Sequence, residues 1–142
     1  MLSAGLFAAA GDRTAGREPR AADALRTLDA IMEEAERWRE TLPDLGVIAP
    51  LEVNGAVASG RIVFATLGSG DRLEYTVIGE AVNLAAKLEK HNKTAATRAL
   101  TSAATYAEAM TQGFVAPCEH RTLAATTVAG VPDAISLVVL KS

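Results

Sequence analysis

Arg72 to Glu89 read RLEYTVIGEAVNLAAKLE, and this stretch contains a strand pattern, a break and a helix pattern in succession. Successive side chains from Arg72 to Ile78 alternate between two faces, as the side chains of a β-strand do. Gly79 then lets the chain turn sharply, and Glu80 to His91 form an apolar-rich run with an acidic residue in its first turn, which is typical of a helix start. The stretch therefore predicts a strand, a tight turn and a helix.

The polar side chains of this predicted helix fall on a single stripe formed by Glu80, Asn83, Lys87 and Lys90. Pattern alone favours a stripe that simply faces solvent, and the wall of a binding site is the alternative interpretation. The first backbone N–H groups of such a helix have no partner within the helix, and they favour anions such as phosphate.

Strand and helix patterns alternate along the rest of the chain. Ser59 and Gly60 are expected to join two strands as a hairpin, and the apolar stretch LSAGLFAAA is interpreted as a buried strand in preference to a signal peptide. The interleaving predicts one α+β domain over residues 1–142, with a largely antiparallel sheet and flanking helices. The expected strands are Leu2–Ala10, Leu51–Ala58, Arg61–Leu67, Arg72–Ile78, Arg98–Thr101, Arg121–Val128 and Ile135–Leu140, and the other expected helices are Ala21–Leu42 and Ala103–Gln112.

Composition narrows the classes of partner. Of the 142 residues, 49% are hydrophobic and 22% are charged, with a net charge of −3 and no long basic block. A nucleic acid or an anionic membrane surface is normally met by clustered Lys and Arg, so we expect neither as a partner. The single cysteine, Cys118, cannot form an internal disulfide, and we expect a cytoplasmic protein.

The run YTVIGEAVNLAAKLE, preceded by GSGDRLE, resembles the central strand–turn–helix of class III adenylate and guanylate cyclases. The family pattern reads approximately R-[LM]-[DE]-[YF]-T-V-I-G-[DE]-x-V-N-x-A-[AS]-R-[LM]-E, and nearly every position matches Arg72 to Glu89. Weaker similarity covers most of the remaining chain, at Ala21–Ala35, Ala56–Leu67, Ala99–Tyr106 and Val128–Leu140.

This resemblance implies a ferredoxin-like nucleotidyl cyclase fold that is N-terminally incomplete, since the family's first strand and its metal-binding aspartates are expected before Met1. The family's first strand lies in the middle of its sheet. We therefore expect unpaired strand edges, with self-association, rearrangement or a vacant groove as the outcome.

The resemblance also implies a function, the conversion of ATP, in preference to GTP, to a cyclic nucleotide and pyrophosphate in intracellular signalling. The family uses Mg²⁺ or Mn²⁺ between two subunits, and we expect the metal ligands to be absent from this chain. By position, Thr76 would read the purine, Asn83 would orient the ribose and Lys87 would contact the reacting phosphate.

Lys87 stands where the family has an arginine, so the planar bidentate fork is missing. The family often has a lysine near Gly130, where this chain has none.

The sequence leaves two functions open. The chain is either a cyclase-like domain that is inactive in isolation, or a non-catalytic nucleotide-binding or dimerisation module with the same fold. A homodimer or another form of self-association is expected in both cases. His91, His120 and Cys118 lack metal-ligand spacing or an activating base, so surface or structural roles are expected for them.

Overall fold

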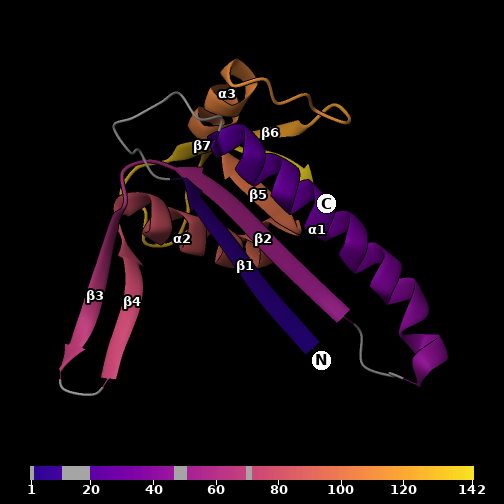
Figure 1. The fold of residues 1–142 in the computed structure, drawn as a ribbon. Helices are drawn as coiled ribbons and strands as arrows, with labels where there is room; N and C mark the ends of the chain where they lie inside the picture. Colours follow the sequence, from indigo (N-terminus) through magenta and orange to yellow (C-terminus); the bar gives the residue numbers. More distant parts are fainter. Residues whose placement is uncertain (1, 11–19, 47–50, 70–71) are drawn as a thin grey trace.

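The computed structural model describes residues 2–10, 20–46, 51–69 and 72–142, which form a five-stranded sheet, a two-stranded ribbon and three α-helices (Figure 1). The helices are α1 (Arg20–Thr41), α2 (Glu80–Ala95) and α3 (Ala103–Thr111), and a short 3₁₀ helix spans Pro43–Leu45. The strands are β1 (Leu2–Ala10), β2 (Leu51–Ser59), β3 (Val63–Ser69), β4 (Arg72–Ile78), β5 (Ala99–Ser102), β6 (Arg121–Thr126) and β7 (Ile135–Lys141).

The main sheet is mixed and runs in the order β1-β2-β5-β7-β6. β1, β2 and β5 pair in parallel, whereas β5, β7 and β6 pair antiparallel. The predicted α+β class is confirmed, and the parallel half follows from the two helical crossovers, since α1 joins β1 to β2 and α2 lies between β2 and β5 along the chain.

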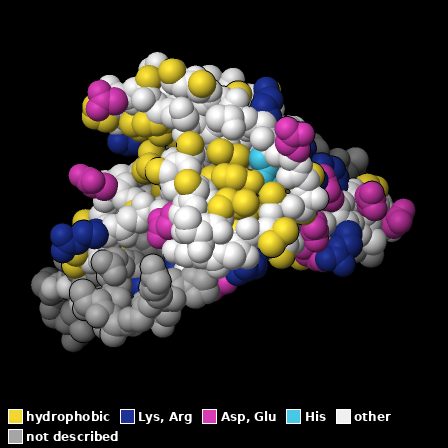
Figure 2. Space-filling model, turned by 90° about the horizontal axis from the view of Figure 1, so that it is seen from above, with side chains coloured by type: hydrophobic (Ala, Val, Ile, Leu, Met, Phe, Trp, Pro, Cys, Tyr) yellow, Lys and Arg dark blue, Asp and Glu magenta, His cyan; other side chains and the backbone are white. Residues whose placement is uncertain are grey.

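The helices cover both faces of this sheet. α1 and α3 pack on one face, where Leu25, Leu28 and Met32 contact side chains such as Val57. α2 packs on the opposite face, where Leu88 joins a second cluster made by Ala56, Leu100, Val128, Leu137 and Val139. Figure 2 views the side of the molecule that is uppermost in Figure 1, and it shows apolar side chains gathered near the centre with charged side chains toward the rim.

Gly55 on β2 faces α1. A Cβ atom at this position would lie 2.4 Å from Cδ1 of Leu28 and 3.0 Å from Cε of Met32. Because both atoms are the ends of flexible side chains, a side chain at position 55 would require Leu28 and Met32 to repack against β2.

One expectation about strand pairing is wrong. β2 does not form a hairpin with β3; it pairs with β1 and β5, whereas β3 pairs with β4 in a separate ribbon that projects from the body (Figure 1). Strand alternation identifies a strand but not its partner, which explains the error. β1 pairs directly with β2 from Leu2–Leu51 to Ala10–Ser59, so these two strands have no vacant position between them.

Candidate functional site

A groove of about 900 Å³ lies where three segments meet: the connection after β2, the first half of α2 and the turn after β6. The described residues that line it are Ser59, Gly60, Arg61, Ile62, Val63, Gly79, Glu80, Ala81, Asn83, Leu84, Lys87, Val131 and Pro132. The stripe of polar side chains on α2 therefore supplies a wall of this groove through Glu80, Asn83 and Lys87. Lys90, the fourth residue of the stripe, is not part of the lining.

The geometry of α2 brings Asn83 and Lys87 together. The two residues are four positions apart, so they lie one above the other on the same helix face. The opposite face is fixed in the core by Ala85 and Leu88, which are both fully buried. Gly79, the residue before the helix, offers no side-chain cap, and Asn83 makes the first backbone bond, to the carbonyl of Gly79 at 3.2 Å.

Lys87 is held by the turn between β6 and β7. Its ammonium group donates a hydrogen bond to the carbonyl oxygen of Gly130. Gly130 has a φ of +79°, and a Cβ atom there would lie 3.1 Å from Cε of Lys87. A residue with a side chain would therefore be strained by the backbone conformation at position 130, and the end of the lysine side chain would have to shift slightly.

Thr76 is placed differently. It is half-buried on β4, where it pairs with Ala65 of the projecting ribbon. It is not among the described residues that line the groove. The structure thus brings Asn83 and Lys87 together and leaves Thr76 outside their groove.

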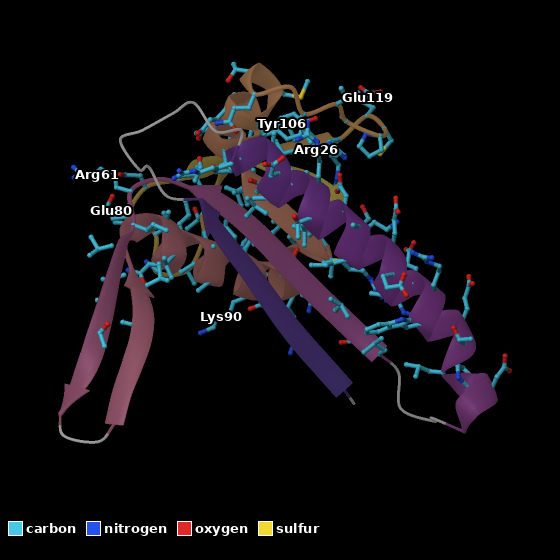
Figure 3. The ribbon with its side chains drawn as sticks, viewed as in Figure 1. Arg26, Arg61, Glu80, Lys90, Tyr106 and Glu119 are labelled. Atoms are coloured by element: carbon cyan, nitrogen blue, oxygen red, sulfur yellow. The ribbon has the colours of Figure 1, made fainter. Side chains whose placement is uncertain are left out.

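Two charged residues of the groove were not identified from sequence. Figure 3 labels Arg61 and Glu80 at the same end of the molecule, near the start of α2, and both line the groove. Glu80 belonged to the predicted polar stripe, but the sequence did not indicate a function for it. Arg61 follows the expected turn at Ser59 and Gly60, and only the fold shows that this connection crosses α2.

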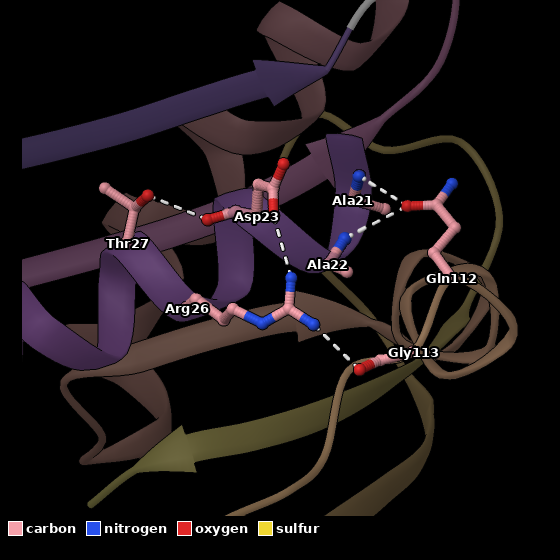
Figure 4. Close-up of polar contacts among 7 residues, drawn as sticks. All are labelled: Ala21, Ala22, Asp23, Arg26, Thr27, Gln112 and Gly113. Carbon is pink, nitrogen blue, oxygen red and sulfur yellow. Dashed lines mark hydrogen bonds and ion pairs between the residues drawn. The ribbon is translucent and has the colours of Figure 1, made fainter. Parts of the chain in front are cut away.

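The rim of the groove is tied to α3 and α1 by a chain of hydrogen bonds. At Ser59, the hydroxyl donates to Oε2 of Glu108 at 2.5 Å and the backbone N–H donates to Oγ1 of Thr105 at 3.0 Å. The other oxygen of Glu108 accepts from Nε2 of Gln112 at 3.0 Å. Oε1 of Gln112 then accepts from the backbone N–H groups of the first turn of α1 (Figure 4).

A second polar cluster lies away from the groove, around Tyr106. Its hydroxyl is 3.1 Å from Nδ1 of His120, and burial, with smaller contributions from Cys118 and Asp29, raises the pKa of Tyr106. Nε2 of His120 is buried and has no hydrogen-bond partner among the described residues. His91, which was expected to be a surface or structural residue, is buried in α2.

The described residues do not fit a site for two divalent metal ions. They contain no group of three or more His, Cys, Asp or Glu side chains that could hold a metal. Glu80 is the one carboxylate in the described lining of the groove, whereas each Mg²⁺ ion usually takes one or two carboxylates beside substrate phosphates and waters, so two ions would have a single carboxylate between them. Within the same described segments, no helix combines the length and the hydrophobicity that a membrane span requires.

Comparisons with known structures show the fold. The chain superposes on the adenylyl cyclase CyaB from P. aeruginosa with a TM-score of 0.68 at 24% identity, covering 91% of this chain and 64% of CyaB. It superposes on the guanylyl cyclase Cya2 with a TM-score of 0.65 at 22% identity, covering 91% of this chain and 61% of Cya2. A bacterial light-regulated adenylyl cyclase gives a TM-score of 0.58 at 22% identity, with 84% of this chain and 32% of that one covered.

The chain has a nucleotidyl cyclase fold. This confirms the architecture that the resemblance of Arg72 to Glu89 implied. In this fold α2 lies beside the groove, which is lined by Asn83 and Lys87 but not by Thr76.

Sequence comparisons give less information about the function than the structural comparisons give about the fold. Uncharacterized proteins of Mycobacterium tuberculosis (Rv1320c) and Mycobacterium bovis (Mb1354c) are each 38% identical to this chain over 82 residues. That match covers 58% of this chain but 13% of each mycobacterial protein. No family model matches the sequence.

Proposed function

We propose that this chain is a cyclase-like domain whose groove binds a purine nucleoside triphosphate, ATP in preference to GTP. One observation carries the proposal: Asn83 and Lys87, one helical turn apart on α2, line the same groove. A carboxamide can both donate and accept hydrogen bonds, which suits ribose hydroxyls, and an ammonium group suits a phosphate oxygen. The fold shared with CyaB and Cya2 supports the assignment.

Within this proposal, Asn83 orients the ribose and Lys87 contacts the reacting phosphate, while Thr76 reads the purine edge from β4. Thr76 lies outside the described lining, so its role requires that the base extend beyond the groove toward the ribbon. The reaction is formation of a cyclic nucleotide with release of pyrophosphate, in the cytoplasm. Mg²⁺ or Mn²⁺ would supply positive charge to the phosphates in this reaction, but the described residues do not fit a site for either ion.

Isothermal titration with ATP tests the binding proposal. We expect ATP to bind the unchanged chain, and we expect Asn83→Ala and Lys87→Gln each to weaken binding by about tenfold, the loss of a hydrogen bond to a charged or well-placed group. Lys90→Gln is the matched control, because this exposed lysine lies on the same helix outside the groove. Equal affinity for all four proteins would refute the proposed site.

A non-catalytic nucleotide-binding or dimerisation module is the second candidate. Two features favour it: the described lining of the groove contains one carboxylate, Glu80, and the ammonium group of Lys87 already donates to the carbonyl of Gly130. Titrations with and without Mg²⁺ separate the candidates, because a catalytic site requires metal-dependent binding. We expect no cyclic nucleotide from these 142 residues with Mn-ATP, because their described part does not fit a two-metal site, and clear turnover would overturn that argument.

Self-association is proposed for both candidates. β1 and β6 are the edge strands of the main sheet, and an open edge can pair with a second copy. Light scattering measures the outcome, and a stable monomer at all concentrations would contradict the proposal.

A further inference from the structure

The connection between β2 and β3 crosses directly over the start of α2, and two glycines make this crossing possible. A Cβ atom on Gly79 would lie 2.5 Å from the carbonyl oxygen of Arg61 and 3.1 Å from Cα of Ile62. A Cβ atom on Gly60 would lie 3.2 Å from Cβ of Ala81. The backbone of Arg61 is therefore fixed against the first turn of α2, at the end of the groove.

The two cationic side chains in the described lining of the groove, Arg61 and Lys87, differ in what they contact. Lys87 is half-buried, and its ammonium group is engaged by the carbonyl of Gly130. The side chain of Arg61 is exposed, and among the residues that the structure describes no hydrogen bond or ion pair engages its guanidinium group. A ligand can bind Arg61 without first breaking a contact, whereas it must share Lys87 with the turn.

The neighbouring charge on the groove is Glu80, at the first position of α2. The negative charge of its carboxylate repels an anionic ligand. Such a ligand therefore needs a strong hydrogen-bond donor close to the start of the helix. A guanidinium group offers paired N–H donors that match two oxygens of one phosphate, and it is always charged at neutral pH.

We propose that Arg61 binds the phosphate-bearing end of the groove's ligand and makes the groove prefer a nucleoside triphosphate over the free nucleoside. This assignment rests on the proposed function and adds a specificity-determining residue to it. Its physical basis is the close packing of the Arg61 backbone against Gly79, together with an exposed guanidinium that no described residue engages, on the same groove as Asn83 and Lys87.

Titrations with ATP, adenosine and inorganic tripolyphosphate test the role of Arg61. We expect Arg61→Gln to weaken binding of ATP and of tripolyphosphate by about 10- to 100-fold, which is the range for hydrogen bonds to charged groups. Adenosine affinity should not change. Arg61→Lys should recover part of the loss, and Glu80→Gln should tighten tripolyphosphate binding.

Arg121→Gln is the matched control, because it removes an exposed arginine of β6 that does not line the groove. Circular dichroism and the urea midpoint establish that each variant is folded. If Arg61→Gln binds ATP and tripolyphosphate as tightly as the unchanged chain does, the assignment of Arg61 is wrong while the proposed function stands. If tripolyphosphate binds through Arg61 but ATP does not bind, the proposed function fails and the anion site remains. Binding of neither ligand would overturn both.

Discussion

Gln112 caps a helix that begins far earlier in the chain. Its Oε1 atom accepts hydrogen bonds from the backbone N–H groups of Ala21, at 2.8 Å, and Ala22, at 3.1 Å, across a sequence separation of 91 and 90 residues (Figure 4). The first N–H groups of a helix have no partner within it, and a cap is normally supplied by the residue just before the helix. In this fold Gln112, the residue that follows α3, supplies it to α1.

Replacing Gln112 by Ala should therefore destabilise the protein by about 2 kcal/mol. Loss of an N-cap costs about 0.5–2 kcal/mol, and the upper end applies because Ala21 and Ala22 are fully buried and two donors lose their acceptor. The exposed bond from Nε2 of Gln112 to Glu108 adds little. For a domain of this size, about 2 kcal/mol corresponds to a decrease in Tm of roughly 4–8 °C.

Urea unfolding followed by circular dichroism measures the stability change, and hydrogen exchange locates it. In Gln112→Ala, the amides of Ala21 and Ala22 should lose more protection than the amide of Leu100 in the central strand. Thr122→Ala, which truncates an exposed side chain on β6, is the control. Gln112→Glu should recover part of the stability, because a carboxylate near a helix N-terminus is favourable although it also faces Glu108. A stability loss under about 0.5 kcal/mol with unchanged exchange at the two amides would refute the capping argument.

Three further predictions concern the core and the pH dependence. Leu100→Ala should cost about 2–5 kcal/mol of unfolding free energy in urea titrations, because this side chain is fully buried between the sheet and α2. Asn92→Ala should cost about 1–3 kcal/mol by the same measurement, since its buried amide donates to the carbonyl of Gly55 at 2.9 Å and accepts from the hydroxyl of Thr97. Burial, with a smaller contribution from Glu33, raises the pKa of Asp29 above its ordinary 3.8. The folded state therefore binds more protons than the unfolded state between 3.8 and the raised value, and stability decreases as the pH rises through that window. In Asp29→Asn the urea midpoint should lose this decrease, and an identical pH profile in both proteins would contradict the assignment.

The local elements were predictable from sequence, and their long-range partners were not. The break at Gly79 and the periodicity after it are local signals, so the boundary between β4 and α2 follows from a few neighbouring residues. The pairing of β2 with β5 is set by α2 packing across the sheet, and no local pattern encodes it. The capping role of Gln112 could not be predicted for the same reason, because nothing in the sequence around Gln112 points to the start of α1.

The candidate site, too, was predictable only where local sequence determines the position of a residue. Asn83 and Lys87 were predicted to share a face because a helix repeats every 3.6 residues, and the structure places both on one groove. Arg61 was missed because its place depends on a backbone crossing between two glycines distant in sequence. The bond between Lys87 and the carbonyl of Gly130 spans 43 residues and likewise requires the folded chain.

The position of β5 has a consequence for synthesis on the ribosome. This four-residue strand is fully buried and joins the parallel half of the sheet to the antiparallel half. Its Thr101 donates to the carbonyl of Val57 on β2, 44 residues earlier in the chain. At translation rates of about 5–20 residues per second, β2 waits roughly 2–9 seconds for its central neighbour after it is made. During that time one edge of β2 lacks its native partner, and an unpaired strand edge is a site at which a nascent chain can aggregate.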